Sequence, residues 1–202
     1  MRKKETRIHR LRTLARRAWV LHARDLKPLG IPQRYLARLC AEGLLVRTGR
    51  GLYVSPNPPG ISHLGLVQVA KAIPKGVICL LSALRFHEVG TQAPHEVWVA
   101  LNRRSARPRV TYPRIRVVRF SGKALTEGIE LHDIGGVRVS IYGPAKTVAD
   151  CFKYRNKIGL DVALEALRDV RRKRKCSNDD LWEYAKTCRV AEVMRPYMEA
   201  TL

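Results

Sequence analysis

The sequence lacks several features that would place it in other classes of protein. It has no run of 18 or more apolar residues, so we expect no transmembrane helix and no membrane partner. Its first residues, MRKKETRIHRLRTLARR, have no apolar core and include Glu5, so we expect no secretory signal. No two of its five cysteines form a C-x-x-C pair, and no cysteines and histidines cluster at the spacing of zinc ligands. We therefore expect reduced thiols, no metal, no cofactor and a cytoplasmic location.

Acidic residues are also scarce. The 202 residues include 17 Asp and Glu against 39 Lys and Arg, which gives a net charge of +22 and a pI near 10.6. Because 46% of the residues are hydrophobic, the chain should fold rather than stay disordered. A folded protein this basic usually binds polyanions, and we favour nucleic acid. The alternatives are an acidic protein partner and a basic surface that is merely solvated.

Patterns of catalytic residues are missing as well. There is no serine elbow and no pair of carboxylates at a strand end. A metal-dependent nuclease site needs acids followed at short spacing by a lysine, and none of Glu96, Glu130 and Asp133 has a lysine two residues later. We therefore expect no catalytic residues and no enzyme. A nucleic-acid-processing enzyme is the alternative from a different class.

A cluster of prolines, SPNPPG at 55–60, predicts two domains: residues 1–55 and 61–202, joined by a linker at 56–60. Within the first domain, apolar residues at helical spacing predict a helix around Leu11. A short extended piece and a short helix follow. A helix that starts at Pro32 and ends at Gly43 precedes two apolar strands around RTGRG. This order predicts a winged helix-turn-helix, which suits insertion of a helix into the DNA major groove.

The second domain is predicted to be mixed. The run 77–90 is compatible with a buried strand or a buried helix, and we favour a helix from about residue 80. The other expected helices cover 63–73, 144–152, 160–170, 177–188 with Ser177 as N-cap, and 191–202 interrupted at Pro196. The expected strands cover 96–101, 114–120 and a hairpin at 128–142 that turns at Gly135-Gly136. The predicted fold class is thus α+β. A winged helix-turn-helix is followed by a larger mixed α/β domain, with a small, mostly antiparallel sheet and C-terminal helices.

The predicted DNA-binding residues lie on the third helix and the hairpin. Residues 1–55 carry fourteen Lys and Arg against three acids. Helical spacing turns Leu36, Leu39 and Cys40 inward. The residues expected to face bases or phosphates are Gln33, Arg34 and Arg38 on the helix, with Arg47, Thr48 and Arg50 at the hairpin. The alternative is a winged helix that serves protein–protein interaction, with a solvated basic face.

Three further basic or charged stretches remain open to interpretation. The run 103–123 holds eight Lys and Arg and no acid. Its Arg103, Arg104, Arg107 and Arg109 could contact phosphates, dock an acidic partner, or lie in a solvated loop. The run RRKRK at 171–175 suits the negative end of a helix dipole. Lys146 and Asp150 lack the spacing of a phosphate-binding loop, and we interpret them as an ordinary pair on a helix surface.

Three segments together resemble the AbiEi family of antitoxins: GLLVRTGRGLYV (43–54), VICLLSALRFHEVGTQAPHEVWVAL (77–101) and GPAKTVADCFKYRNKIGLDVALEALRD (143–169). The resemblance implies a bacterial type IV toxin–antitoxin, or abortive-infection, system that defends against phage. In this family a winged helix binds and represses the operon's own promoter, and a C-terminal domain counteracts a nucleotidyltransferase-like toxin of the AbiEii type. By position, the DNA-reading helix falls at 32–42 and the wing at 44–54.

The resemblance leaves two matters open. One is whether a toxin gene accompanies this gene, since the alternative is a solo winged-helix regulator of transcription. The other is the oligomeric state. Helix-turn-helix proteins often bind paired half-sites, which is compatible with a homodimer on double-stranded DNA or with side-by-side binding on repeats.

Overall fold

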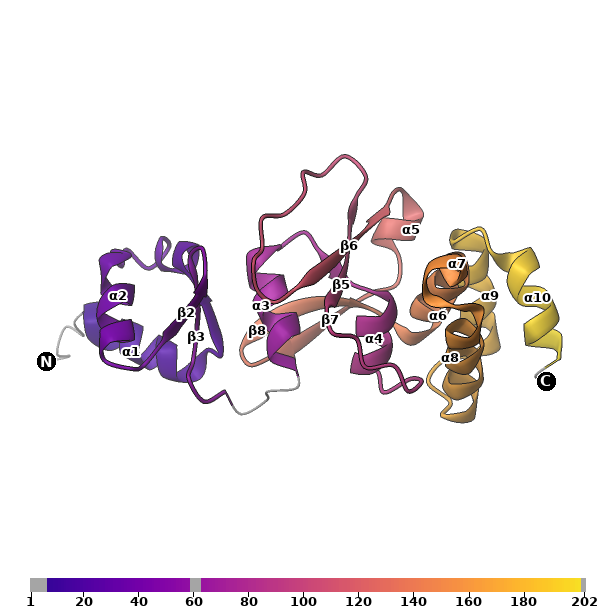
Figure 1. Cartoon of the computed structure of the whole chain (residues 1–202), viewed down its shortest axis with the longest axis horizontal. Helices are drawn as coiled ribbons and strands as arrows, with labels where there is room; N and C mark the ends of the chain where they lie inside the picture. The colour runs from indigo at the N-terminus through magenta and orange to yellow at the C-terminus, as the bar shows by residue number, and fades with distance from the viewer. Residues whose placement is uncertain (1–6, 59–62, 201–202) are drawn as a thin grey trace, which may run out of the picture. The chain divides into compact units, whose positions relative to one another are not determined.

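A computed structural model describes residues 7–58 and 63–200 (Figure 1). The chain forms two compact units. The first comprises the chain up to Lys75 together with the segments Pro108–Arg114 and His132–Val139, and the second comprises the rest. The helix Leu64–Ala72, here α3, therefore belongs to the first unit. The predicted linker at 56–60 lies partly outside the described residues, and the division there stays a prediction.

The first unit combines helices with a small sheet. Its elements in chain order are α1 (Arg7–Arg17), β1 (Val20–His22), the 3-10 helix η1 (Ala23–Leu26), α2 (Arg34–Ala41), β2 (Val46–Gly49), β3 (Leu52–Val54) and α3 (Leu64–Ala72). The three strands are antiparallel, in the order β1-β3-β2. Up to β3 this is the predicted order of helix, extended piece, short helix, helix and hairpin.

Leucines from several of these elements share one core. Leu11 of α1, Leu26 of η1, and Leu36 and Leu39 of α2 are all fully buried. Gly43 ends α2 as predicted: it has a left-handed φ of +70°, and the following N–H of Leu44 donates to the carbonyl of Leu39 at 2.9 Å. The core thus fixes α2 by one face and leaves its other face to solvent.

An unexpected cap starts η1. The Nδ1 of His22 accepts a hydrogen bond from the backbone N–H of Arg24 at 3.2 Å, and the Asp25 carboxylate accepts one from the N–H of His22 at 2.9 Å. Burial lowers the pKa of His22, which favours the neutral ring that can accept. Histidine is not a usual N-cap residue, so this reciprocal capping box could not be predicted from residue type.

The second unit contains most of a five-stranded sheet. The strands are β4 (Val77–Ile78), β5 (Val97–Asn102), β6 (Ile115–Phe120), β7 (Ile129–Ile134) and β8 (Val137–Tyr142), in the order β6-β5-β4-β8-β7. β4 and β5 are antiparallel, but β4 pairs with β8 and β5 pairs with β6 in parallel. The expectation of a mostly antiparallel sheet was therefore wrong. Residues 103–114 form a connection long enough to bring β6 alongside β5 in the same direction.

The turn between β7 and β8 was predicted correctly. Gly135 and Gly136 both have positive φ, +58° and +73°, as a two-residue hairpin turn of type I′ requires. Gly135 also lies against the indole of Trp19 within the first unit, where an added Cβ would overlap the ring. Any side chain at position 135 would therefore displace Trp19.

Helices make up the remainder of the second unit. They are α4 (Leu80–Phe86), α5 (Lys123–Thr126), α6 (Pro144–Lys153), α7 (Arg155–Ile158), α8 (Leu160–Arg172), α9 (Asn178–Thr187) and α10 (Ala191–Glu199). Figure 1 shows α6 to α9 gathered into one bundle. Ser177 caps α9 as predicted, since its hydroxyl accepts from the N–H of Asp180 at 3.0 Å. The predicted interruption at Pro196 was wrong, because α10 continues through it and anchors Met194 and Met198 in the core.

The basic run at the end of α8 clamps a neighbouring loop. Lys173 Nζ donates to the carbonyl of Glu88 and Lys175 Nζ to that of His87, both at 2.6 Å. These carbonyls follow the last turn of α4, so the lysines satisfy acceptors that the helix leaves free. Asp169 of α8 completes the clamp: its carboxylate accepts from the N–H of Gly90 at 3.0 Å and pairs with Lys173 at 2.7 Å.

We expect Asp169→Asn to destabilise the protein by about 2 kcal/mol at neutral pH. The ion-paired hydrogen bond with Lys173, followed by the bond from Gly90, lowers the pKa of Asp169 to about 2. Because the folded-state pKa is depressed, this stabilisation is complete above about pH 4 and is lost as the pH falls towards 2. Urea unfolding at several pH values should show the gap between wild type and variant closing over that window. Glu183→Gln, at an exposed position of α9, is the control, and a gap that does not change with pH would contradict the assignment.

Candidate nucleic-acid interface

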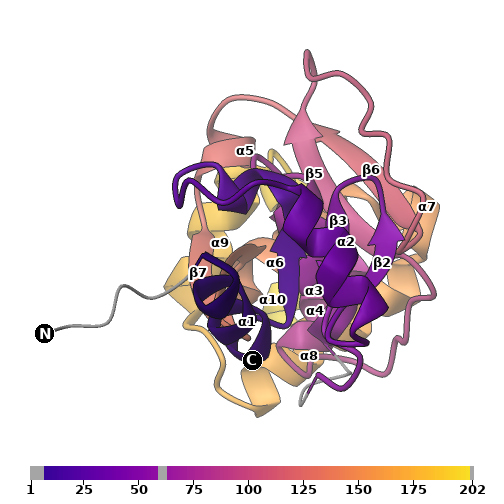
Figure 2. The same cartoon turned by 90° about the vertical axis from the view of Figure 1, so that its left-hand side faces the viewer.

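The helix α2 presents basic side chains on the face opposite the core. Leu36 and Leu39 point inward and are fully buried, whereas Gln33, Arg34 and Arg38 are exposed. The helix is shorter than predicted, Arg34–Ala41 instead of Pro32–Glu42, and Gln33 is its N-cap residue. Figure 2 shows α2 beside the strands β2 and β3. The predicted residues of α2 therefore occupy one exposed face and its N-terminal end.

At that N-terminal end, Gln33 makes no side-chain capping bond, which leaves its amide available to a ligand. The guanidinium of Arg34 lies 5.7 Å from the centre of the Tyr35 ring, within the range of a cation–π contact. The backbone N–H groups of Tyr35 and Leu36 already donate to the carbonyls of Pro32 and Gln33. The end of α2 thus presents two side-chain groups, the Arg34 cation and the Gln33 amide.

Arg38 is held by an acid that the sequence interpretation did not include. Its Nε lies 3.0 Å from Glu42 Oε1, and the Glu42 carboxylate also accepts from Arg12 of α1, at 2.9 Å to either oxygen. These bonds, with that from Arg12 first, lower the pKa of Glu42. Arg12 and Glu42 are 30 positions apart, so no spacing rule could pair them. Arg12 therefore joins Arg38 in one basic group around a single carboxylate.

The hairpin β2–β3 carries the remaining predicted residues. Arg47 on β2 and Arg50 in the turn are exposed. A register shift between Arg47 and Gly49 leaves Thr48 as the extra residue of a bulge. Thr48 is half-buried, and its Oγ1 lies 3.5 Å from Nε2 of Gln68, a buried residue of α3. The structure thus places the two arginines outward and turns Thr48 towards α3.

The four arginines predicted after β5 lie in the connection 103–114 and are all exposed. Among the residues that the structure describes, no carboxylate forms an ion pair with Arg103, Arg104, Arg107 or Arg109. Arg109 belongs to the first unit, and the other three belong to the second. The four arginines are therefore divided between the two units.

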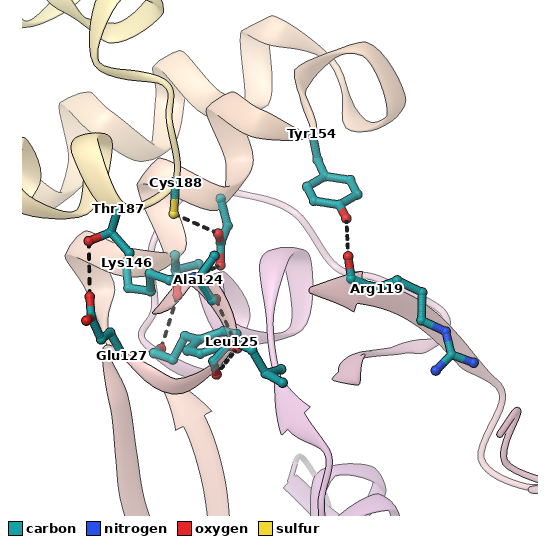
Figure 3. Close-up of polar contacts among 11 residues, drawn as sticks. Arg119, Ala124, Leu125, Glu127, Lys146, Tyr154, Thr187 and Cys188 are labelled. Atoms are coloured by element: carbon teal, nitrogen blue, oxygen red, sulfur yellow. Dashed lines mark hydrogen bonds and ion pairs between the residues drawn. The ribbon is translucent and has the colours of Figure 1, made fainter. Parts of the chain in front are cut away.

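A buried polar network lies in the second unit, where an ordinary surface pair was expected (Figure 3). Lys146 and Asp150 of α6 are both fully buried, with Nζ 2.6 Å from Oδ2. Lys146 Nζ also lies 4.0 Å from the centre of the Tyr142 ring, and the Cys188 thiol donates to Asp150 Oδ1 at 3.2 Å. The prediction of an exposed pair was wrong, because helices and strands cover α6 on every side.

Burial governs the protonation of this network. It raises the pKa of Asp150, against the opposing effect of Lys146, and it raises that of Cys188 to about 12, so the thiol keeps its proton and serves as a donor. The Tyr142 hydroxyl donates to the carbonyl of Leu125 at 2.7 Å. No buried side-chain polar atom of the described residues lacks a partner. The polar side-chain atoms of this network are therefore satisfied within the protein.

Within residues 7–58 and 63–200, no group of three or more His, Cys, Asp and Glu side chains is arranged to hold a metal ion. None of the helices in these ranges has both the length and the apolar character needed to cross a bilayer.

Comparison with known proteins finds a family match in the first part of the chain. Residues 9–56 match the family model described as "Transcriptional regulator, AbiEi antitoxin". The matched segment spans α1 to β3 and contains every predicted residue of α2 and the hairpin. Over these residues the chain is thus similar to the transcriptional-regulator domain of AbiEi antitoxins. The predicted resemblance is confirmed for this segment.

The whole fold is similar to that of a solved structure. The crystal structure of the Rv2827c protein from Mycobacterium tuberculosis superposes with a TM-score of 0.64 at 17% sequence identity, covering 98% of this chain and 79% of that one. At this identity the likeness concerns the fold alone. No curated protein sequence matches the chain.

Proposed function

We propose that this protein is a DNA-binding antitoxin of a type IV toxin–antitoxin system. In this proposal the elements from α1 to β3 form a winged helix-turn-helix that binds the operon's own promoter and represses it. The second unit counteracts a nucleotidyltransferase-like toxin of the AbiEii type. Support comes from the family match over residues 9–56, whose description names both transcriptional regulation and the antitoxin.

The observation that carries DNA binding is the placement of the arginines. Arg34 and Arg38 project from the exposed face of α2, while Leu36 and Leu39 fix the opposite face in the core. An α-helix fits the major groove, and the residues at its N-terminal end are those that reach base edges. We assign base or register contacts to Gln33, Arg34 and Arg38.

The hairpin supplies the second contact. Arg47 and Arg50 are exposed on β2 and at the turn, as a wing that binds phosphates or a neighbouring groove requires. Thr48 is left out of the contact set because its hydroxyl lies against Gln68. Arg12 is added, because Glu42 places it in the same basic group as Arg38.

The test combines both activities in one cell. The full-length protein is co-expressed with the nucleotidyltransferase-like gene beside its own, and a reporter is driven by the DNA upstream of the operon. We expect the reporter to be repressed and growth to be restored. Absence of both effects would contradict the proposal.

A solo regulator is the second candidate, because the family match ends at residue 56 and so covers only the regulator domain. The same experiment separates the two. Repression of the reporter with no change in growth would identify a regulator without an antitoxin role, whereas protection without repression would remove promoter binding from the proposal.

A further inference from the structure

One exposed segment of the second half of the chain belongs to the same compact unit as α2 and the hairpin. This segment is Pro108–Arg114, the latter part of the connection between β5 and β6. An added Cβ at Gly49, at the end of β2, would lie 3.8 Å from Thr111 Oγ1. The segment therefore passes within van der Waals distance of the hairpin, next to Arg50.

The side chains on this segment are basic or aromatic and face solvent. Arg109 and Arg114 are exposed, and the ring of Tyr112 between them is 58% exposed. The sequence contains no acidic residue from Val97 to Thr126. Within the described ranges, neither arginine forms an ion pair with a carboxylate. Two unneutralised cations and an exposed phenol thus lie beside the hairpin, contributed by a segment about 60 residues further along the chain.

We propose that Pro108–Arg114 is a third DNA-contacting element, which binds the phosphate backbone next to the wing. The inference rests on the proposed function, because it takes the hairpin as the wing on DNA. Guanidinium groups and a tyrosine hydroxyl are donors that commonly bind phosphate oxygens. Such contacts add affinity without reading sequence, and they release counterions. A duplex held by the wing would therefore continue onto the surface of Pro108–Arg114.

DNA is favoured over an acidic protein because of the position of the segment. An acidic protein partner would need no proximity to the wing, whereas a duplex on the wing extends past it along neighbouring phosphates. Contact with DNA would also account for the exposure of Tyr112, a large aromatic ring that otherwise lies in solvent.

The test uses the full-length Arg109→Ala/Arg114→Ala variant, and separately Tyr112→Phe, which removes only the hydroxyl. The matched control is Lys186→Ala/Arg189→Ala, which removes the same charge at exposed positions of the second unit. Binding is measured by fluorescence anisotropy over a range of salt concentrations, on a duplex from the operon's own promoter and on a scrambled duplex. Thermal melting verifies that each variant is folded.

We expect Arg109→Ala/Arg114→Ala to weaken binding to both duplexes by the same factor, about 5- to 20-fold, and to reduce the slope of log K against log salt by about 2, or about 0.9 per phosphate contact. Tyr112→Phe should weaken binding to both duplexes by a smaller factor, and the control should bind as wild type.

Wild-type affinity and slope in the double variant would overturn the inference. Intact DNA binding combined with lost protection from the toxin would assign the segment to an acidic protein partner instead. Failure of the wild type itself to bind either duplex would contradict the proposed function rather than this inference alone.

Discussion

Lys146→Met alone should lower the free energy of unfolding by roughly 3–5 kcal/mol, the largest effect on stability that we expect from a single substitution in this protein. Methionine is unbranched like lysine and only one atom shorter, so it keeps most of the packing against Tyr142 and Phe120. What it removes is the charge that balances Asp150, which is fully buried on the same helix. The carboxylate is then left without a counter-ion in an apolar surrounding.

The loss should depend on pH in a defined direction. Burial already raises the pKa of Asp150 in the wild type, and removal of Lys146 should raise it further. An acid whose pKa is higher in the folded state is neutral in both states at a pH below its unfolded pKa, and there it costs the fold no charge burial. The folded state loses stability as the pH rises from that value through the folded-state pKa. The variant should therefore be closest to wild type in acid and should lose stability towards neutral pH.

Urea unfolding monitored by tryptophan fluorescence measures this, since Trp98 and Trp182 both belong to the second unit. Lys153→Met on the same helix is the control, because Lys153 is exposed and its replacement should change stability by less than about 0.5 kcal/mol. The double variant Lys146→Met/Asp150→Leu should recover most of the loss, because a buried ion pair contributes little more than a well-packed apolar pair. Equal stability of Lys146→Met and wild type would show that the pair does not carry a buried charge.

The double variant Arg34→Ala/Arg38→Ala should lose specific promoter binding. We expect each substitution to cost about 1–3 kcal/mol if the side chain contacts a base, or about 2–6 kcal/mol together if the effects add. The fold should survive, because both side chains lie on the exposed face of α2. Binding to a scrambled duplex should fall far less, so the ratio of specific to non-specific affinity should collapse.

A gel shift with both duplexes measures that ratio. Lys27→Ala/Lys75→Ala, which removes two exposed charges of the first unit outside α2 and the hairpin, should leave it unchanged. A uniform loss on both duplexes would identify Arg34 and Arg38 as phosphate contacts only. Unchanged promoter binding would show that α2 is not the recognition helix.

Local signals in the sequence predicted the local parts of the fold. Pro32 and Gly43 bracket α2, Ser177 starts α9, and the two glycines at 135 and 136 set the hairpin turn. In each case one residue type controls the backbone around it. The positions of the basic residues on α2 were also predictable, because helical periodicity relates only residues that are close in the sequence.

Non-local features were the ones that sequence reasoning missed. The parallel pairing of β5 with β6 depends on where a long connection returns the chain, which no residue type encodes. The polar residues of α6 resemble an exposed face, yet Lys146 and Asp150 satisfy each other in the core. The candidate site shows the same limit. The α2 arginines could be named from spacing, whereas Arg12 joins them only through Glu42, and the turning of Thr48 towards Gln68 needs the packing of α3.

Glu42 gives the proposed DNA surface an internal competitor. A single carboxylate accepts hydrogen bonds from both Arg12 and Arg38, so a phosphate that approaches either guanidinium must first displace it. DNA of arbitrary sequence only replaces one anion by another, which adds little to the free energy of binding. A site whose bases also bind Arg38 adds more binding free energy than the displacement of Glu42 costs. Glu42 would thus lower the affinity for DNA that makes no base contacts with Arg38. Discrimination between sites would then depend on an acid that itself contacts no base.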